Sequence, residues 1–159
     1  MPPACFLPQY STKAADIHER LLLCCENDEE EETVLHTLLI VDDEEIEREG
    51  MAQFIPWDSY EIKVVSTARN GAEGLEKIAK FRPDLAIVDI KMPVMNGLEA
   101  TKIIRESNTE IPIIMQTAYA FSSDKENAMN AGATEVLVKP ITLSILRTTL
   151  SKYLPDLQW

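Results

Sequence analysis

The chain has 159 residues, of which 45% are hydrophobic, and this is enough for one ordinary core but short for two. Its formal net charge of −12 disfavours direct binding to nucleic acid or to an anionic membrane surface. Half of that charge lies in residues 1–33, which hold eight acidic and two basic side chains. We therefore expect an N-terminal tail at 1–33, able to form a short helix and an acidic linker, one globular domain at 34–155 and a C-terminal tail at 156–159.

The three cysteines all lie in the predicted tail, at positions 5, 24 and 25. Neither their odd number nor their spacing indicates a disulfide framework or a zinc site. The first residues lack the basic segment of a signal peptide, and the longest purely apolar run, 21–25, is too short to cross a bilayer. We therefore expect a cytoplasmic protein without a membrane partner.

From residue 34 onward, short apolar runs alternate with helical patterns, as in stacked βαβ units. The runs are rich in Val, Ile and Leu, which is typical of a parallel sheet covered by helices on both faces. The sequence thus predicts an α/β fold with strands at 35–41, 63–68, 85–88, 111–116 and 136–138 and helices at 44–54, 71–80, 96–105, 122–130 and 142–153. Residues 56–60 are expected to form a longer loop.

Residues at the predicted helix ends support these boundaries. Ser122 or Ser123 can cap the helix at 122–130, and Gly132 is suited to end it. Thr142 lies one turn before Ile145 and can cap the last helix. Each predicted helix is thus expected to begin and end close to the ranges given above.

Four of the predicted strands end at side chains with useful chemistry. Asp42 and Asp43 follow the first strand, Asp89 the third, Thr117 the fourth and Lys139 the fifth. Because the carboxyl ends of parallel strands lie along one edge, and open α/β sheets bind ligands there, we expect these groups to meet in one crevice. Any one of the motifs alone is explained as well by a helix cap or a solvated charge; their coincidence at successive strand ends is what indicates a site.

Three carboxylates brought together at the strand ends resist joint ionisation unless a cation compensates them. Hard oxygen ligands, without His or Cys nearby in the sequence, favour Mg²⁺, with Mn²⁺ as an alternative. With such a metal bound, one carboxylate can act as a nucleophile towards phosphorus, and we predict Asp89 for this role. Lys139 could neutralise a phosphoryl oxygen and Thr117 could donate its hydroxyl to another.

The segments LLIVDDEE, LAIVDIKMPVMNGLEA, IIMQTAYA and VLVKPIT closely resemble the receiver domain of bacterial two-component response regulators and hybrid histidine kinases. The resemblance runs from about residue 35 to residue 154. It implies a doubly wound, flavodoxin-like sheet of five parallel strands in the order 2-1-3-4-5, with helices on both faces. It also implies phosphorelay signal transduction as the function.

The resemblance further implies a role for each residue of the crevice. Asp89 would be the phosphoacceptor, and Mg²⁺ would be bound by Asp43, Asp89 and the backbone carbonyl of Lys91, with Asp42 helping mainly through water. Thr117 would be the switch hydroxyl and Lys139 its ion-pair partner. The Lys139–Pro140 bond would be cis.

One position departs from the family pattern, and for two more the resemblance implies a place beside the access route to the site. Family members usually carry Tyr or Phe three residues before the lysine, as an aromatic rotamer switch, and this chain has Val136 there. Lys91 and Tyr119 occupy positions that in the family flank the access route and tune the lifetime of the phosphoryl group.

The resemblance implies a histidine kinase or a histidine phosphotransfer protein as the phosphodonor and an output partner of unknown identity. It also implies possible dimerisation through the helix at 122–130, the strand at 136–138 and the helix at 142–153. Such a module is not an enzyme in the usual sense, although it catalyses its own phosphorylation and dephosphorylation.

Two alternatives remain open. The first is a phosphatase or phosphotransferase with an aspartyl-phosphate intermediate, of the haloacid dehalogenase type. Such enzymes usually carry a second aspartate two residues after the nucleophile, where this chain has Lys91, and this argues against turnover. The second is an interaction scaffold that is not phosphorylated, and the intact acidic set argues against it.

Overall fold

The computed structural model describes residues 35–154, and the predictions for residues 1–33 and 156–159 lie outside this range. Five strands form one parallel sheet in the order β2-β1-β3-β4-β5. The elements are β1 (His36–Val41), α2 (Glu45–Phe54), the 3₁₀ helix η2 (Trp57–Tyr60), β2 (Ile62–Ala68), α3 (Gly71–Phe81), β3 (Leu85–Asp89), α4 (Gly97–Ser107), β4 (Ile113–Thr117), α5 (Ser122–Ala131), β5 (Glu135–Val138) and α6 (Leu143–Tyr153). The predicted fold class and strand order are confirmed.

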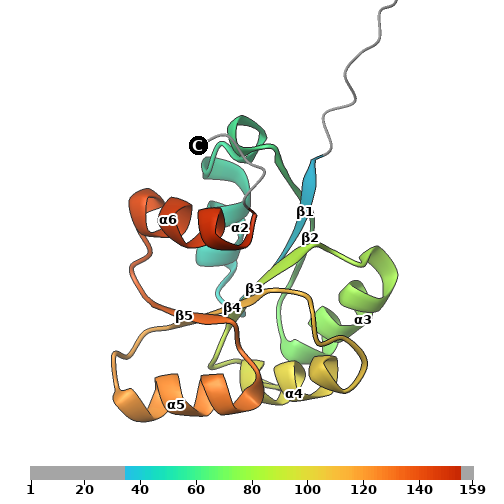
Figure 1. Ribbon diagram of the computed structural model, residues 1–159, viewed down its shortest axis with the longest axis vertical. Coiled ribbons are helices and arrows are strands. Elements are labelled where there is room, and N and C mark those ends of the chain that lie inside the picture. The colour runs from blue at the N-terminus through green and yellow to red at the C-terminus, as the bar shows by residue number, and fades with distance from the viewer. Residues whose placement is uncertain (1–34, 155–159) are drawn as a thin grey trace, which may run out of the picture. The chain divides into compact units, whose positions relative to one another are not determined.

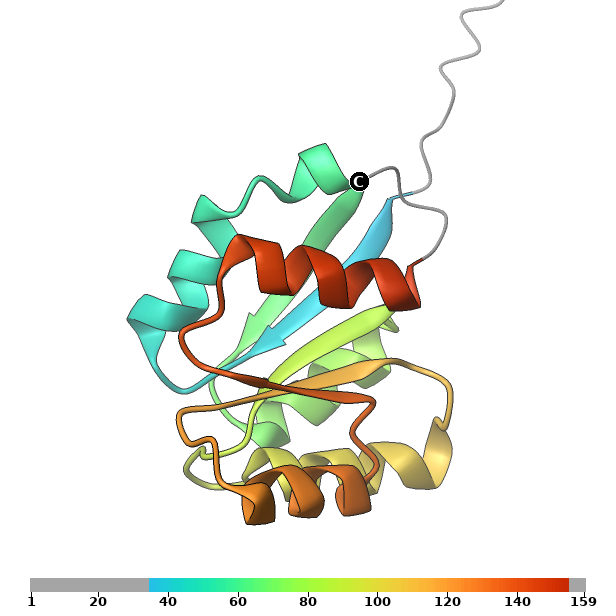
Figure 2. The ribbon, with the colours of Figure 1, turned by 60° about the vertical axis from the view of Figure 1, so that its left-hand side comes forward.

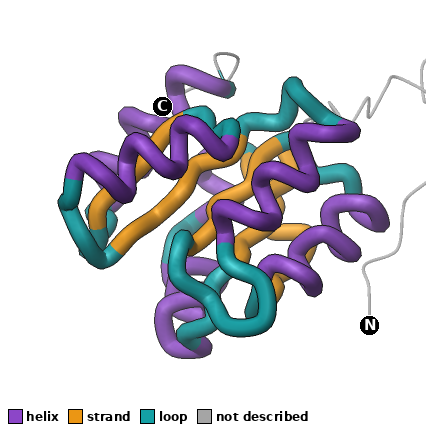
Figure 3. The backbone as a smooth tube through the Cα atoms, turned by 90° about the horizontal axis from the view of Figure 1, so that it is seen from below, coloured by secondary structure: helices purple, strands orange, loops and turns teal. Residues whose placement is uncertain are grey.

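The sheet lies between two helical layers, with α2 and α6 on one face and α3, α4 and α5 on the other (Figure 1). Figure 3 shows the strands running between helices on both sides. Side chains of β1 alternate between the two layers: Leu38 belongs to the buried cluster that contains Leu150 of α6, and Leu39 to the cluster that contains Ile104 of α4. A strand buried on both faces needs apolar side chains at successive positions, which explains the unbroken apolar runs in the sequence.

The local signals at the helix ends are confirmed in two places out of three. The Thr142 side chain accepts a hydrogen bond from the Ile145 N–H and caps α6, and Gly132 ends α5 with a φ of +102°. The prediction that Ser122 or Ser123 caps α5 is wrong. The N-cap is Phe121, whose extended backbone carries no side-chain cap, because the helix already begins at Ser122.

The predicted loop at 56–60 is also wrong in part, because residues Trp57–Tyr60 form the 3₁₀ helix η2. Trp57 is buried, and its Nε1 donates a hydrogen bond to the Met51 carbonyl at 2.8 Å. The indole ring thus attaches this short helix to α2 and to the core cluster beneath it.

The carboxyl ends of the strands are in register along one edge of the sheet, as Figure 2 shows for the central strands. Val41 lies beside Val88, Asp89 beside Gln116, and Thr117 beside Val138. The residues that follow these positions therefore enter the same space. The Lys139–Pro140 peptide bond at this edge is cis, as the resemblance implies.

Candidate functional site

Lys139 joins two of the predicted carboxylates directly. Its Nζ lies 2.9 Å from Asp42 Oδ2 and 2.9 Å from Asp89 Oδ1. The two aspartates come from the ends of β1 and β3, and the lysine from the end of β5. The edge of the sheet thus brings together an ammonium and two carboxylates that are far apart in the sequence.

A cavity of about 140 Å³ opens beside this cluster. Of the predicted site residues, Asp42 is the one that does not line it, because Asp42 is buried behind Lys139 with 1% of its surface exposed. The lining residues are Asp43, Glu44, Asp89, Lys91, Thr117, Ala118 and Lys139. A polar cavity of this size, lined by carboxylate, hydroxyl and ammonium groups, suits a small anion together with a cation.

Both carboxylate oxygens of Asp42 already have partners within the protein. Oδ1 accepts a hydrogen bond from the Glu44 N–H at 2.9 Å. Oδ2 accepts from Lys139 Nζ and also from Gln116 Nε2, the latter at 2.5 Å. Asp42 is therefore oriented by three donors.

Sequence reasoning missed Gln116 as a member of the site. It is fully buried at the end of β4, and its Oε1 has no hydrogen-bond partner within the described part of the chain. A signal was present, because Gln116 is the one amide in an otherwise apolar run. A buried amide needs a polar partner, and that partner is Asp42.

Asp89 ends β3 in an environment that disfavours its own negative charge. Burial raises the pKa of the Asp89 carboxyl, and the neighbouring Asp42 carboxylate adds to the effect. Hydrogen bonds from Lys139 and from the Lys91 N–H, the latter at 2.8 Å, oppose the rise without cancelling it. One ammonium therefore does not fully compensate the carboxylates, and a further cation would stabilise them.

Lys139 contacts a third carboxylate that was not among the predicted site residues, that of Glu47 on α2. The Nζ to Oε2 distance is 2.5 Å. Burial lowers the pKa of Lys139, but its hydrogen bonds to the three carboxylates outweigh this and raise the pKa above its ordinary value. Lys139 is therefore charged at every physiological pH.

Thr117 lies at the end of β4 with 3% of its surface exposed. Its Oγ1 accepts a hydrogen bond from the Tyr119 N–H at 3.2 Å. An oxygen that accepts this bond still carries its own proton, which is available for an acceptor in the cavity.

Lys91, which lines the cavity, contacts the ring of Tyr119. The Lys91 Nζ lies 4.0 Å from the centroid of the Tyr119 ring, and that ring stacks on Phe121 with centroids 5.9 Å apart. Such a cation–π contact restrains both side chains. The structure thus places the two predicted access residues against one another.

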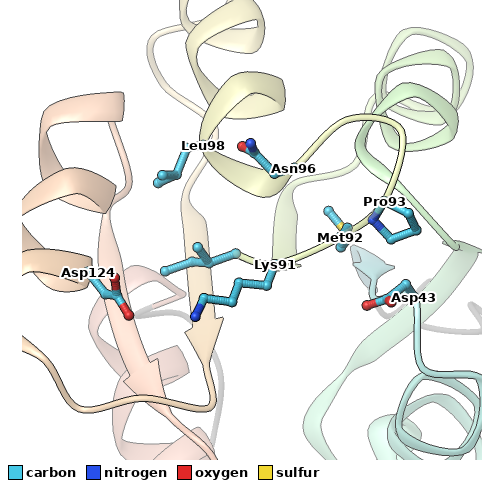
Figure 4. A pocket seen from close by; sticks show the side chains of 8 residues that line it. Asp43, Lys91, Met92, Pro93, Asn96, Leu98 and Asp124 are labelled. Atoms are coloured by element: carbon cyan, nitrogen blue, oxygen red, sulfur yellow. The ribbon is translucent and has the colours of Figure 1, made fainter.

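A second, larger pocket of about 480 Å³ adjoins the first and shares Asp43 and Lys91 with it. Figure 4 shows Lys91 pointing towards the side where Asp124 lies and away from Asp43. The other lining residues are Asp124 of α5 and, from the segment after β3 and from α4, Ile90, Met92, Pro93, Asn96 and Leu98. The cavity beside Asp89 thus adjoins a second pocket along this segment.

The oxygen donors at the cavity meet the needs of a divalent metal only in part. Within residues 35–154, no three His, Cys, Asp or Glu side chains form a group that could hold a metal ion by themselves. Asp43 and Asp89 nevertheless line the same cavity. Mg²⁺ is commonly held by one or two carboxylates and completed by water and phosphate oxygens, so this donor set fits it.

The response regulator receiver domain profile matches residues 38–151 of the chain. The chain belongs to this family. Its receiver domain is 38% identical over 99 residues to the transcriptional regulatory protein LnrK of Bacillus subtilis, a match that covers 62% of the chain and 44% of LnrK. It is 39% identical over 88 residues to the sensor protein EvgS of Escherichia coli K12, covering 55% of the chain and 7% of EvgS.

Among solved structures, the REC domain of AraT, a response regulator from Geobacillus stearothermophilus, superposes with a TM-score of 0.70 at 34% identity. That match covers 77% of this chain and 95% of the AraT domain. The chain spans less than half the length of LnrK and a small part of EvgS, so the similarity extends to only a part of each of these proteins. As a receiver domain it is a module of two-component phosphorelay signalling.

Gly97, the first residue of α4, packs directly against the backbone of Asp89 and so helps to hold the Asp89 carboxylate in its position in the receiver domain. A Cβ built at Gly97 would overlap the Asp89 carbonyl oxygen and lie 3.2 Å from Ile90 Cα. These are backbone atoms that cannot move without displacing the Asp89 side chain. We expect Gly97→Ala to lower the free energy of unfolding by about 2–3 kcal/mol, measured by urea denaturation.

Gly50→Ala is the matched control for this substitution. Gly50 lies inside α2, and its added Cβ would meet its nearest atom, Phe54 Cδ2, at an ordinary 3.9 Å. Alanine is the better helix former, so this variant should gain about 0.5–1 kcal/mol. Equal stability of the two variants would contradict the steric argument at Gly97.

Proposed function

We propose that this receiver domain accepts a phosphoryl group from a phosphohistidine donor onto Asp89 in a Mg²⁺-dependent reaction and then alters a partner-binding surface. The observation that supports this most is the shared cavity of Asp43, Asp89, Thr117 and Lys139 at the carboxyl edge of the sheet. The donor would be a histidine kinase or a histidine phosphotransfer protein. The domain would thus work in the cytoplasm, together with its phosphodonor.

Asp43, Asp89 and the Lys91 carbonyl would hold the Mg²⁺, and Mn²⁺ could replace it. Asp42 would contribute through water, because both of its carboxylate oxygens already accept hydrogen bonds from protein donors. The metal would supply positive charge for the phosphoryl oxygens and the two carboxylates. This assignment is supported by the donor set and by the burial of Asp89, which raises the pKa of its carboxyl and which a bound cation would offset.

In the proposed transfer, an Asp89 carboxylate oxygen forms a bond to phosphorus while the bond from phosphorus to the donor's imidazole nitrogen breaks. The imidazole leaves, and the phosphoryl group is then held as an acyl phosphate. Lys139, already 2.9 Å from Asp89 Oδ1, would neutralise one phosphoryl oxygen. The Thr117 hydroxyl would donate to another, and positioning with electrostatics would account for the rate.

The surface that changes would be formed by α5, β5 and α6, through which the domain could also dimerise. Exposed apolar side chains on these elements support this choice: Met129, Val138, Leu143 and Ile145. The residue at the usual aromatic switch position is Val136, which packs partly buried against the core. This receiver therefore has no aromatic ring there. The phosphoryl signal would instead pass from Thr117 to the segment before α5, where Tyr119 and Phe121 are stacked.

Incubation with MgCl₂ and acetyl phosphate, followed by mass spectrometry of the intact protein, tests the proposal. We expect one phosphoryl group per chain, and none when EDTA removes the metal. Sustained multiple-turnover release of phosphate would instead indicate a phosphatase or phosphotransferase. The absence of any adduct in the presence of Mg²⁺ would indicate a scaffold.

A further inference from the structure

All three N–H donors of the Lys139 ammonium face carboxylates. The acceptors are Asp42 Oδ2 at 2.9 Å, Asp89 Oδ1 at 2.9 Å and Glu47 Oε2 at 2.5 Å. An ammonium has three donors and no more. A phosphoryl oxygen can therefore bind Lys139 only if one of these three contacts is given up.

The three carboxylates differ in how much solvent they meet. The side chains of Asp42 and Asp89 are 1% and 8% exposed, whereas that of Glu47 is 43% exposed. A buried carboxylate that loses its cation is left without solvation, but an exposed one is hydrated at once. When Asp89 becomes an acyl phosphate, Asp42 and Glu47 are the two partners of Lys139 that remain carboxylates, and of these the contact to the exposed Glu47 is the less costly to break.

Position supports the same distinction. Glu47 lies in the first turn of α2 and does not line the cavity that holds Asp89, Thr117 and Lys139. Asp42 is further held by Gln116 and by the Glu44 N–H. Glu47 thus binds Lys139 from outside the reacting groups.

We propose that Glu47 is a positioning residue that competes with the phosphoryl group for Lys139 and so weakens the receiver's hold on that group. The inference rests on the proposed function of Asp89 as phosphoacceptor. In the unphosphorylated state Glu47 occupies the third donor of Lys139. On phosphorylation Lys139 exchanges Glu47 for a phosphoryl oxygen, and the strength of the Glu47 contact sets how far this exchange proceeds.

The experiment measures the affinity for beryllium trifluoride, a phosphoryl analogue, by calorimetry at saturating Mg²⁺. Glu47→Gln is expected to bind the analogue about threefold to fivefold more tightly than the unchanged protein, the range that an exposed ion pair provides. Its acyl phosphate should also persist longer after acetyl phosphate is removed. Both effects follow from the loss of the competing acceptor.

Glu45→Gln is the matched control, since Glu45 lies in the same first turn of α2 and is exposed. It removes the same charge without removing a contact to Lys139, so it should change the affinity by less than half as much. Glu47→Asp keeps the charge but shortens the side chain, and it should resemble Glu47→Gln. Thermal unfolding of each variant verifies that the fold is retained.

The outcomes separate this inference from the proposed function. If the unchanged protein binds no analogue and forms no adduct, the proposed function is wrong. The role of Glu47 is overturned, and the proposed function stands, if the unchanged protein binds the analogue but Glu47→Gln binds it no more tightly than the unchanged protein does. The same conclusion follows if Glu47→Gln binds the analogue no more tightly than Glu45→Gln does.

Discussion

Asp89→Asn is expected to abolish the phosphoryl adduct that forms with MgCl₂ and acetyl phosphate. The amide has the shape of the carboxylate but lacks the anionic oxygen that attacks phosphorus. It can still accept a hydrogen bond from the Lys91 N–H, which now reaches Asp89 Oδ2 at 2.8 Å. The loss should therefore be complete and should not depend on misfolding.

The stability of this variant follows from the pKa of Asp89. Because the pKa is raised in the folded state, the folded protein binds the proton more tightly than the unfolded chain does. The contribution of this group to stability is thus greatest at low pH and is lost as the pH rises through the folded-state pKa. A neutral amide side chain avoids that loss, so at neutral pH Asp89→Asn should unfold at the same temperature as the unchanged protein or higher.

Asp58→Asn is the control for Asp89→Asn. Asp58 is exposed on η2, away from the cavity, and its substitution changes the net charge by the same amount. This variant should be phosphorylated like the unchanged protein. A full adduct in Asp89→Asn would place the phosphoacceptor on another carboxylate, with Asp43 as the first to examine.

Lys139→Met is expected to have the second large effect. It leaves Asp42 and Asp89, both buried, without their shared cation. Removing one partner of a buried ion pair costs about 3–5 kcal/mol, and partial exposure of Lys139 reduces this, so we expect a loss of about 2 kcal/mol in EDTA. Urea denaturation measures it.

Mg²⁺ should partly reverse the loss in Lys139→Met, because a ligand that binds the folded state alone raises its stability. The metal would replace the missing positive charge, and the increase in stability on adding MgCl₂ should exceed that of the unchanged protein. Phosphorylation by acetyl phosphate should nevertheless be slower, since no ammonium remains beside the phosphoryl oxygens. A variant that gains no more from Mg²⁺ than the unchanged protein would argue against a metal at these carboxylates.

Lys152→Met provides the matched comparison for Lys139→Met. Lys152 pairs with Glu135 at 3.1 Å, but its side chain is 53% exposed. Exposed pairs contribute about 0–1 kcal/mol, so this variant should be close to the unchanged protein in stability. It should also respond to Mg²⁺ as the unchanged protein does.

The sequence predicted the edge of the sheet at which the site lies, because strand ends are set by short-range patterns. A run such as Leu38 to Val41 is buried on both faces and is recognisable by its continuity. The residue after such a run then falls at the carboxyl edge of a parallel sheet. This is why Asp89, Thr117 and Lys139 could be assigned to one cavity before their contacts were known.

The partners of those residues could not be predicted in the same way. Gln116 meets Asp42 across 74 residues, and Lys139 meets Asp42 across 97. Whether Gln116 faces a carboxylate, and whether Glu47 reaches Lys139, depends on the packing of α2 and on the direction of single side chains. The N-cap of α5 was wrong for a similar reason, since the backbone at Phe121 begins the helix one residue earlier than a serine cap requires.

Local periodicity and motif were sufficient to establish the family, the succession of strands and helices, and the strand ends that carry acidic, hydroxyl and ammonium groups. That one ammonium is divided among three carboxylates of unequal burial became evident only from the folded chain. This division depends on distances and solvent exposure, which arise when β1, β3, β5 and α2 are packed together.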